Sequence, residues 1–169
     1  MNKSSPLAQR GQSGFTLVEL ITVMLIIGIM AVVVLPRFDV LRGYDQIGYR
    51  DKVKATLEYA RKSAVAQRRN VQVALAGSSL TLTIASGIPE GLAANTFDRS
   101  LNLPARDGAC GGATNRICAP ANIALGGPAT LTFSPLGRPS ALGTYTVTDT
   151  SPGGDTSTIS VMAETGYVQ

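Results

Sequence analysis

Gly14-Phe15-Thr16-Leu17-Val18-Glu19 joins a short basic leader to an apolar run that extends to Leu35. Within that run, Glu19 is the single ionisable side chain. As a helix, residues 15–35 would measure about 31 Å, close to the hydrocarbon thickness of a bilayer. A carboxylate at membrane depth costs about 2.5–3.5 kcal/mol by insertion scales, so such residues usually have a function and a partner. The stretch therefore predicts a membrane-spanning helix in which Glu19 needs a cation.

The leader precedes the apolar run, and it contains no apolar segment of its own. A secretory signal peptide has the opposite order, with the apolar segment before the cleavage point. Lys3 and Arg10 predict that the leader faces the cytoplasm and that the residues after the apolar run lie outside. A cut between Gly14 and Phe15 would leave the apolar helix at the start of the mature protein. The new α-amino group would lie four residues before Glu19, as a candidate partner for its carboxylate.

Residues 14–19, followed by an apolar helix, resemble the cleavage and methylation site of type IV pilins and type II secretion pseudopilins. The resemblance implies that a prepilin peptidase cuts after Gly14 and N-methylates Phe15. The family's acidic residue falls on Glu19, where it would pair with the N-terminal amine of a neighbouring subunit, or with its own amine before assembly. A family proline falls on Pro36. A signal anchor that happens to carry one acid is the alternative interpretation, and composition alone leaves it open. The Gly-Phe junction, the spacing of Glu19 and Pro36 together exclude it.

The chain divides into four predicted segments: a prepilin leader peptide (1–14), a transmembrane or filament-core helix (15–36), an amphipathic helix (37–69) and a β-rich head domain (70–169). The exported part has the size of one ordinary domain. The leader holds two of the 15 basic residues, which leaves 13 basic against 11 acidic residues after cleavage. The pI of about 9.3 is therefore a weak argument for a nucleic-acid partner.

The residues after Pro36 predict that the helix continues. Apolar and small side chains recur at spacings of three and four, which is typical of an amphipathic helix. We expect one long helix from Phe15 to about Arg69, with bends or local melting near Pro36, Gly43 and Gly48. The apolar stripe comprises Leu41, Tyr44, Ile47, Val53, Leu57, Ala60 and Ala64, and its buried part is expected to begin near Val53.

From Asn70 the apolar period changes to two, which indicates strands. Residues 71–75 and 80–84 alternate on either side of Gly77-Ser78 and predict a hairpin. The stretch 86–127 is predicted to be mainly loop, with short strands around 97–103 and 123–125. Further strands are predicted at 130–133, 145–148, 159–162 and 167–168.

A helix followed by antiparallel strands predicts an α+β fold in which the amphipathic half of the helix covers one face of a sheet. The order of helix, hairpin, variable middle, Ser134-Pro135-Leu136-Gly137-Arg138 and a last strand near Glu164-Thr165-Gly166-Tyr167-Val168 resembles minor subunits of the GspH and FimT type. Residues 38–69 also resemble minor pilins of mannose-sensitive haemagglutinin (MSHA) pilus systems, which are MshC-like. The resemblance implies a type IV pilin-like fold, with the apolar half of the helix projecting beyond the sheet.

Cys110 and Cys118 are the only cysteines, and the orientation argument places them outside the cytoplasm. An oxidising compartment favours a disulfide between them. Closing a loop of about nine residues would stabilise the fold by about 2–3 kcal/mol in the chain-entropy model. Because the chain has no His, two thiols fall short of the four ligands of a structural zinc site.

No pattern in the chain indicates catalysis. No Ser, Thr or Cys stands beside a recognisable base, and no Walker loop, dinucleotide fingerprint or calcium loop occurs. We therefore predict a protein that is not an enzyme and that needs neither a metal nor a cofactor.

Arg138 is the candidate for a nucleic-acid contact. Some DNA-uptake minor pilins that this chain resembles hold phosphates with a Gly-Arg-x-Arg motif. Here Gly137-Arg138 is followed by Pro139-Ser140, so the second arginine is missing. One phosphate contact gives little affinity at physiological salt, so DNA is not an expected partner.

The resemblance implies a minor pilin that is assembled into a type IV pilus or initiates it. It would be held in the inner membrane by a single pass with a periplasmic C-terminal domain, and would be extracellular once assembled. A minor pseudopilin of a type II secretion system is the alternative with the same architecture. A pilus-tip module that binds DNA or a surface is the alternative of another class. The partners implied are a prepilin peptidase, other pilins or pseudopilins, and an assembly platform with its ATPase.

Overall fold

The structure is a computed structural model of the whole chain, and it describes residues 15–34, 37–88 and 95–169. The chain splits into two compact units, Met1–Val40 and Leu41–Gln169, and each is described by itself. The predicted leader with Gly14, and the predicted landmark Pro36, lie outside the described residues.

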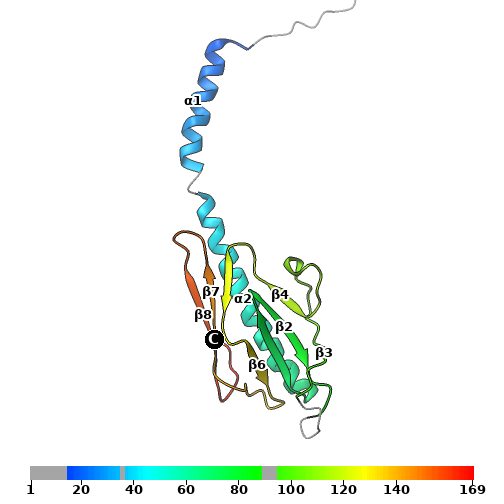
Figure 1. Cartoon of the computed structure of the whole chain (residues 1–169). Helices are drawn as coiled ribbons and strands as arrows, with labels where there is room; N and C mark the ends of the chain where they lie inside the picture. Colours follow the sequence, from blue (N-terminus) through cyan, green and yellow to red (C-terminus); the bar gives the residue numbers. More distant parts are fainter. Residues whose placement is uncertain (1–14, 35–36, 89–94) are drawn as a thin grey trace, which may run out of the picture. The chain divides into compact units, whose positions relative to one another are not determined.

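In the first unit, helix α1 comprises Leu17–Val34 (Figure 1). Its large apolar side chains are exposed, from Leu17 at 75% to Met30 at 64%. Of the helices formed by the described residues, none combines the length and the apolar character that a membrane crossing requires. The membrane span expected over 15–36 stays a prediction.

Helix α2 comprises Arg37–Gln67 and runs without a break through Gly43 and Gly48. The local melting expected at these two glycines is therefore wrong, whereas the expected bends stay a prediction. The described residues form helices α1 and α2, and residues 35–36, through which the predicted single helix would run, lie outside them. Arg68 ends α2 with a left-handed backbone (φ 50°), its N–H bonded to the Val65 carbonyl and the N–H of Arg69 to the Ala64 carbonyl. Glycine usually occupies such a position because a side chain there costs about 1–2 kcal/mol.

The buried face of α2 follows the predicted helical spacing. Val53, Leu57, Ala60 and Ala64 are all fully buried, as expected. The buried face starts earlier than predicted, because Tyr49 is 2% and Gln46 is 5% exposed. The small side chains at positions 60 and 64 let the strands approach the helix closely.

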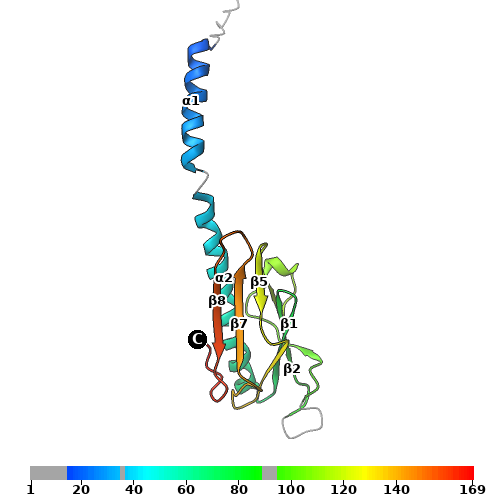
Figure 2. The same cartoon turned by 60° about the vertical axis from the view of Figure 1, so that its left-hand side comes forward.

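Two antiparallel sheets complete the second unit (Figures 1 and 2). The first has the order β3-β2-β1-β6, with β4 also paired to β2, and the second has the order β5-β7-β8. The strands are β1 Val71–Ala76, β2 Ser79–Ile84, β3 Arg99–Ser100, β4 Arg116–Cys118, β5 Ile123–Gly126, β6 Thr130–Phe133, β7 Gly143–Asp149 and β8 Thr156–Val161. A short 3-10 helix, η1, comprises Gly108–Cys110. The expected α+β fold, a helix packed on antiparallel sheet, is confirmed.

The strand predictions differ in how far they hold. The hairpin β1–β2 and strand β6 lie at the predicted positions, with Ala76 paired to Ser79 across the turn. Strand β8 starts three residues earlier than expected, and the predicted last strand is a single bridge between Val161 and Val168. Strand β4 was not predicted, because its three residues carry too short an alternation to stand out from the surrounding loop.

The core of the second unit lies between α2 and the inward faces of both sheets. Inward side chains alternate along the strands, as the fully buried Leu80, Leu82, Tyr145 and Val147 illustrate. Gln46 attaches α2 to the second sheet by donating to the carbonyls of Val147 at 3.0 Å and Asp155 at 2.8 Å. Burial of each large apolar side chain contributes about 1.5–3 kcal/mol, so this interface supplies most of the stability.

Candidate functional site

The start of α1 is fixed by a side-chain cap. The backbone N–H of Glu19 donates to Thr16 Oγ1 at 3.2 Å, and the N–H of Leu20 donates to the Thr16 carbonyl at 3.2 Å. Threonine followed three residues later by glutamate is the sequence pattern of a capping box. The helix therefore begins directly after the predicted cleavage point, with Phe15 as the last residue before the cap.

Glu19 is the single acid of α1 and lies in its first turn. Negative charge there is favoured by the helix dipole by about 0.3–1 kcal/mol when exposed. Phe15, the predicted first residue after cleavage, is 84% exposed. The capped turn thus carries one carboxylate four residues after the predicted new amine, on a helix that is otherwise largely apolar. The roles predicted for Gly14, Phe15, Glu19 and Pro36 remain predictions.

In the second unit, the disulfide predicted between Cys110 and Cys118 is present, with a Cα–Cα distance of 5.3 Å. It joins η1 to β4. The side chain of Asp107 lies beside it and is 6% exposed. Its Oδ2 accepts from the Cys118 N–H at 2.9 Å, and its Oδ1 accepts from the Ala109 N–H at 3.2 Å and from Lys52 Nζ at 3.1 Å.

These contacts set the ionisation of Asp107. Burial by itself would raise the pKa of its carboxyl, but the hydrogen bonds from the Cys118 N–H and from Lys52 outweigh burial and hold the pKa below its ordinary value. The nearby Tyr49 donates to the Ser78 carbonyl at 3.0 Å. Burial, and then the charge of Asp107, raise the pKa of Tyr49 above its ordinary range. The buried carboxylate is thus charged and fully bonded, and it ties α2 to the disulfide loop.

The sequence reasoning missed Asp107. Its signal was available, because Asp before Gly108 is a favoured residue to cap a helix start, and Asp107 caps η1. The sequence gives no indication of the contact between Asp107 and Lys52, because 55 residues separate the two.

Arg138, the weak candidate for a nucleic-acid contact, lies in an ion pair. Its Nη2 is 3.5 Å from Glu164 Oε2, and both side chains are well exposed. Such an exposed pair contributes about 0–1 kcal/mol. The loops that carry the two residues meet, since a Cβ added at Gly166 would overlap the Gly137 carbonyl oxygen. Glu164 therefore opposes the approach of a phosphate to Arg138.

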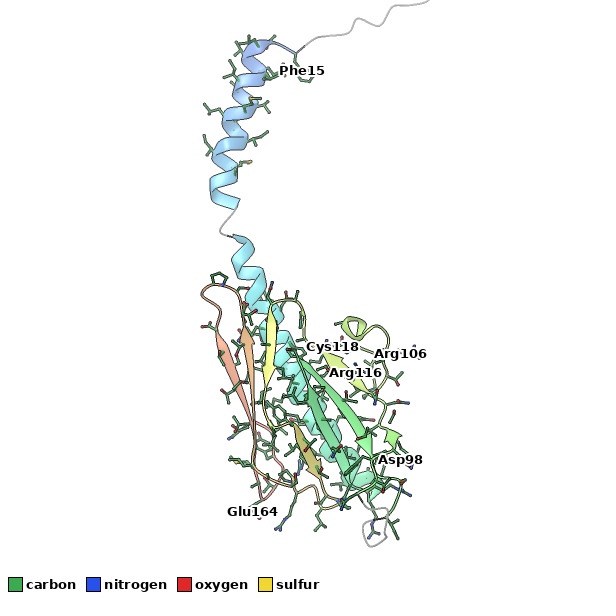
Figure 3. All side chains as sticks on the ribbon, viewed as in Figure 1. Phe15, Asp98, Arg106, Arg116, Cys118 and Glu164 are labelled. Atoms are coloured by element: carbon green, nitrogen blue, oxygen red, sulfur yellow. A yellow bond between two sulfur atoms is a disulfide. The ribbon has the colours of Figure 1, made fainter. Side chains whose placement is uncertain are left out.

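The disulfide and the Arg138–Glu164 ion pair lie in different parts of the second unit. Figure 3 shows Cys118, Arg106 and Arg116 on one side and Glu164 at the opposite end. Among the described residues, no group of three or more His, Cys, Asp or Glu side chains is gathered as a metal site would need.

Comparisons with known proteins gave two kinds of match. A family model described as the prokaryotic N-terminal methylation motif matches residues 9–35. Two crystal structures of the Pseudomonas aeruginosa type IV minor pilin FimU, in space groups P21 and P65, are similar at 20% sequence identity. The similarity covers 70% of this chain and 82% and 86% of the two FimU chains, with TM-scores of 0.46 and 0.45. A comparison with curated proteins gave no significant match.

Proposed function

We propose that the chain is a minor pilin, cleaved after Gly14 by a prepilin peptidase, methylated at Phe15, and assembled through α1 into a type IV pilus of the MSHA kind. The observation that carries the proposal is the N-terminal methylation motif over residues 9–35, which contains both residues of the predicted cleavage point and Glu19. Before assembly the protein is held in the inner membrane with its second unit in the periplasm.

The described part of α1 supports this proposal. A helix that is apolar all round needs to be buried, in a membrane or among other helices. The exposed apolar side chains of α1 supply such a surface. Glu19 interrupts it at the capped first turn, where its carboxylate can pair with a Phe15 amine. Two charges buried among helices are tolerable only when they pair, so the pair fixes the register of subunits more than it adds stability.

The first test is peptide mass spectrometry of sheared surface fibres and washed envelopes from the native host. We expect the N-terminal peptide to begin with N-methylated Phe15 and to occur in the fibres. An intact leader in both fractions would show that the pilin proposal is wrong and that 15–35 is a simple anchor.

A second test is Glu19→Gln, which keeps the side-chain size and removes the charge. An unpaired buried amine costs about 3–5 kcal/mol, so incorporation into fibres should fall more than about a hundredfold. Cleavage at Phe15 and the melting temperature of the second unit should not change. Glu58→Gln is the matched control, because it changes an acid of α2 whose ion-pair partner among the described residues is the exposed Lys62. Normal incorporation of Glu19→Gln would contradict the assembly role.

A deletion strain separates the pilin from the alternative with the same architecture. Loss of pili with normal protein secretion supports the minor pilin. Loss of secretion with intact pili would instead support a minor pseudopilin of a type II secretion system.

A further inference from the structure

A concave site of about 270 Å³ lies between α2 and the loop 103–107 of the second unit. Its walls are largely apolar, with Ala55 and Tyr59 from α2, Leu103 and Pro104 from the loop, and Ile117 from β4. We call it the Arg106 pocket, after the arginine at its rim. Its volume is below the roughly 300–1,000 Å³ of small-molecule and cofactor sites, and above the roughly 150 Å³ cavity that holds one benzene. The pocket therefore has room for one bulky apolar side chain.

The wall of the Arg106 pocket is held rigidly. Tyr59 donates its hydroxyl to the Asn102 carbonyl at 2.8 Å, and the Leu103 N–H donates to the Thr114 carbonyl at 2.7 Å. Asp107 and the disulfide fix the other end of the loop, as described above. A pocket formed in advance loses little conformational entropy when it is filled, which favours binding.

The rim of the pocket is positively charged. Asp107 is the acid of the lining, but its carboxylate is buried and bonded to Lys52. Arg106 at the rim is exposed, and among the described residues it takes part in no ion pair. Figure 3 labels Arg106 on the same side of the second unit as Cys118. The charge that complements this rim is negative.

We propose that the Arg106 pocket binds a partner protein through one bulky apolar side chain flanked by carboxylates. The apolar walls take the side chain, and Arg106 pairs with an acid beside it. A nucleic acid fits less well, since its affinity comes from many phosphate contacts and the lining of the pocket offers one arginine, Arg106, between apolar walls. This interaction surface lies wholly in the second unit, so it does not depend on cleavage, methylation or assembly at the N-terminus.

The test is a methyl NMR titration of the full-length protein in detergent micelles with three capped tripeptides. Acetyl-Glu-Phe-Glu-amide is the matched probe, acetyl-Lys-Phe-Lys-amide reverses its charge, and acetyl-Glu-Ala-Glu-amide lacks the bulky side chain. We expect the first to shift the methyl signals of Ala55, Leu103 and Ile117 at millimolar concentrations. Because repulsion from Arg106 replaces the attraction, the Lys peptide should bind about fivefold more weakly. The Ala peptide should leave these signals unchanged.

Two variants locate the binding. Ala55→Phe fills the pocket from an exposed position and should abolish the shifts, whereas Val65→Phe, on an exposed position of the same helix outside the pocket, should keep them. Arg106→Glu should weaken the Glu-Phe-Glu peptide and strengthen the Lys-Phe-Lys peptide.

Three outcomes would overturn the proposal that the Arg106 pocket binds a partner protein. It fails if no peptide shifts the pocket methyls, if the acidic and basic peptides bind equally, or if Ala55→Phe binds as well as Val65→Phe. Shifts of these methyls by a single-stranded DNA oligonucleotide, in the absence of any effect of the acidic peptide, would replace the protein partner with a nucleic acid.

Discussion

Asp107→Asn is expected to destabilise the second unit through the disulfide loop. The carboxylate of Asp107 accepts three hydrogen bonds, and an asparagine amide keeps one oxygen but turns an NH₂ group toward a backbone donor. A hydrogen bond to a charged group contributes about 1.5–3 kcal/mol, and the Lys52 pair less, because the Lys52 side chain is 43% exposed. The expected loss is about 2–4 kcal/mol, or a fall in melting temperature on the order of 10 °C.

The loss should depend on pH in a defined direction. The folded-state pKa of Asp107 lies below its ordinary value, so its charged form stabilises the fold above the unfolded pKa of about 3.9. That contribution is lost as the pH falls through the folded pKa. The difference in unfolding free energy between the wild type and Asp107→Asn should therefore be constant near neutral pH and shrink below about pH 4.

The assay is urea unfolding followed by circular dichroism, on oxidised full-length protein at pH 7 and at a series of acidic pH values. Asp51→Asn is the matched control, because the Asp51 side chain is 65% exposed and its ion pair within the described part of the chain, with Arg50, is 3.8 Å long. We expect the control to change stability by less than about 0.5 kcal/mol. The reasoning is refuted if Asp107→Asn behaves like the control, or if its effect is the same at pH 7 and in acid.

Two further predictions concern the backbone of the second unit. Gly166→Ala should lower the free energy of unfolding by about 2–4 kcal/mol, as measured by thermal unfolding. A Cβ at this position would overlap the Gly137 carbonyl oxygen, and the backbone has a positive φ of 64°. Gly153→Ala, at φ 77° with no neighbour within 4 Å, should cost only about 1 kcal/mol, and equal losses would show that the contact is not tight. Replacing both Cys110 and Cys118 by Ser should lower the free energy of unfolding by about 2–3 kcal/mol, and an unchanged urea midpoint would contradict the entropic account.

Features that depend on neighbouring residues could be predicted well. The hairpin β1–β2 follows from period-two alternation around Gly77-Ser78, and the buried face of α2 follows from spacings of three and four. The disulfide was predicted from two cysteines eight positions apart in a segment that the orientation argument places outside the cytoplasm. Each of these signals is contained in a short stretch of chain, which is why the sequence reveals it.

The effect of two glycines on α2 was predicted less well. Gly43 and Gly48 lower helix propensity, yet α2 is continuous through both. Each glycine costs about 1 kcal/mol, which the packing of the residues that follow Gly48 outweighs. A local preference of this size decides the structure only where tertiary contacts are absent.

The sequence by itself determined the N-terminal motif, the apolar run that follows it, the change from helix to strand at Asn70 and the cysteine pair. Tertiary structure alone decided that Asp107 is buried against Lys52, that Glu164 pairs with Arg138, and that an apolar pocket opens beside Arg106. The physical reason is the separation along the chain. A pattern of period two or 3.6 is contained in each segment, whereas a hydrogen bond between residues 52 and 107 exists only after the sheets have packed on α2 and the disulfide loop has closed.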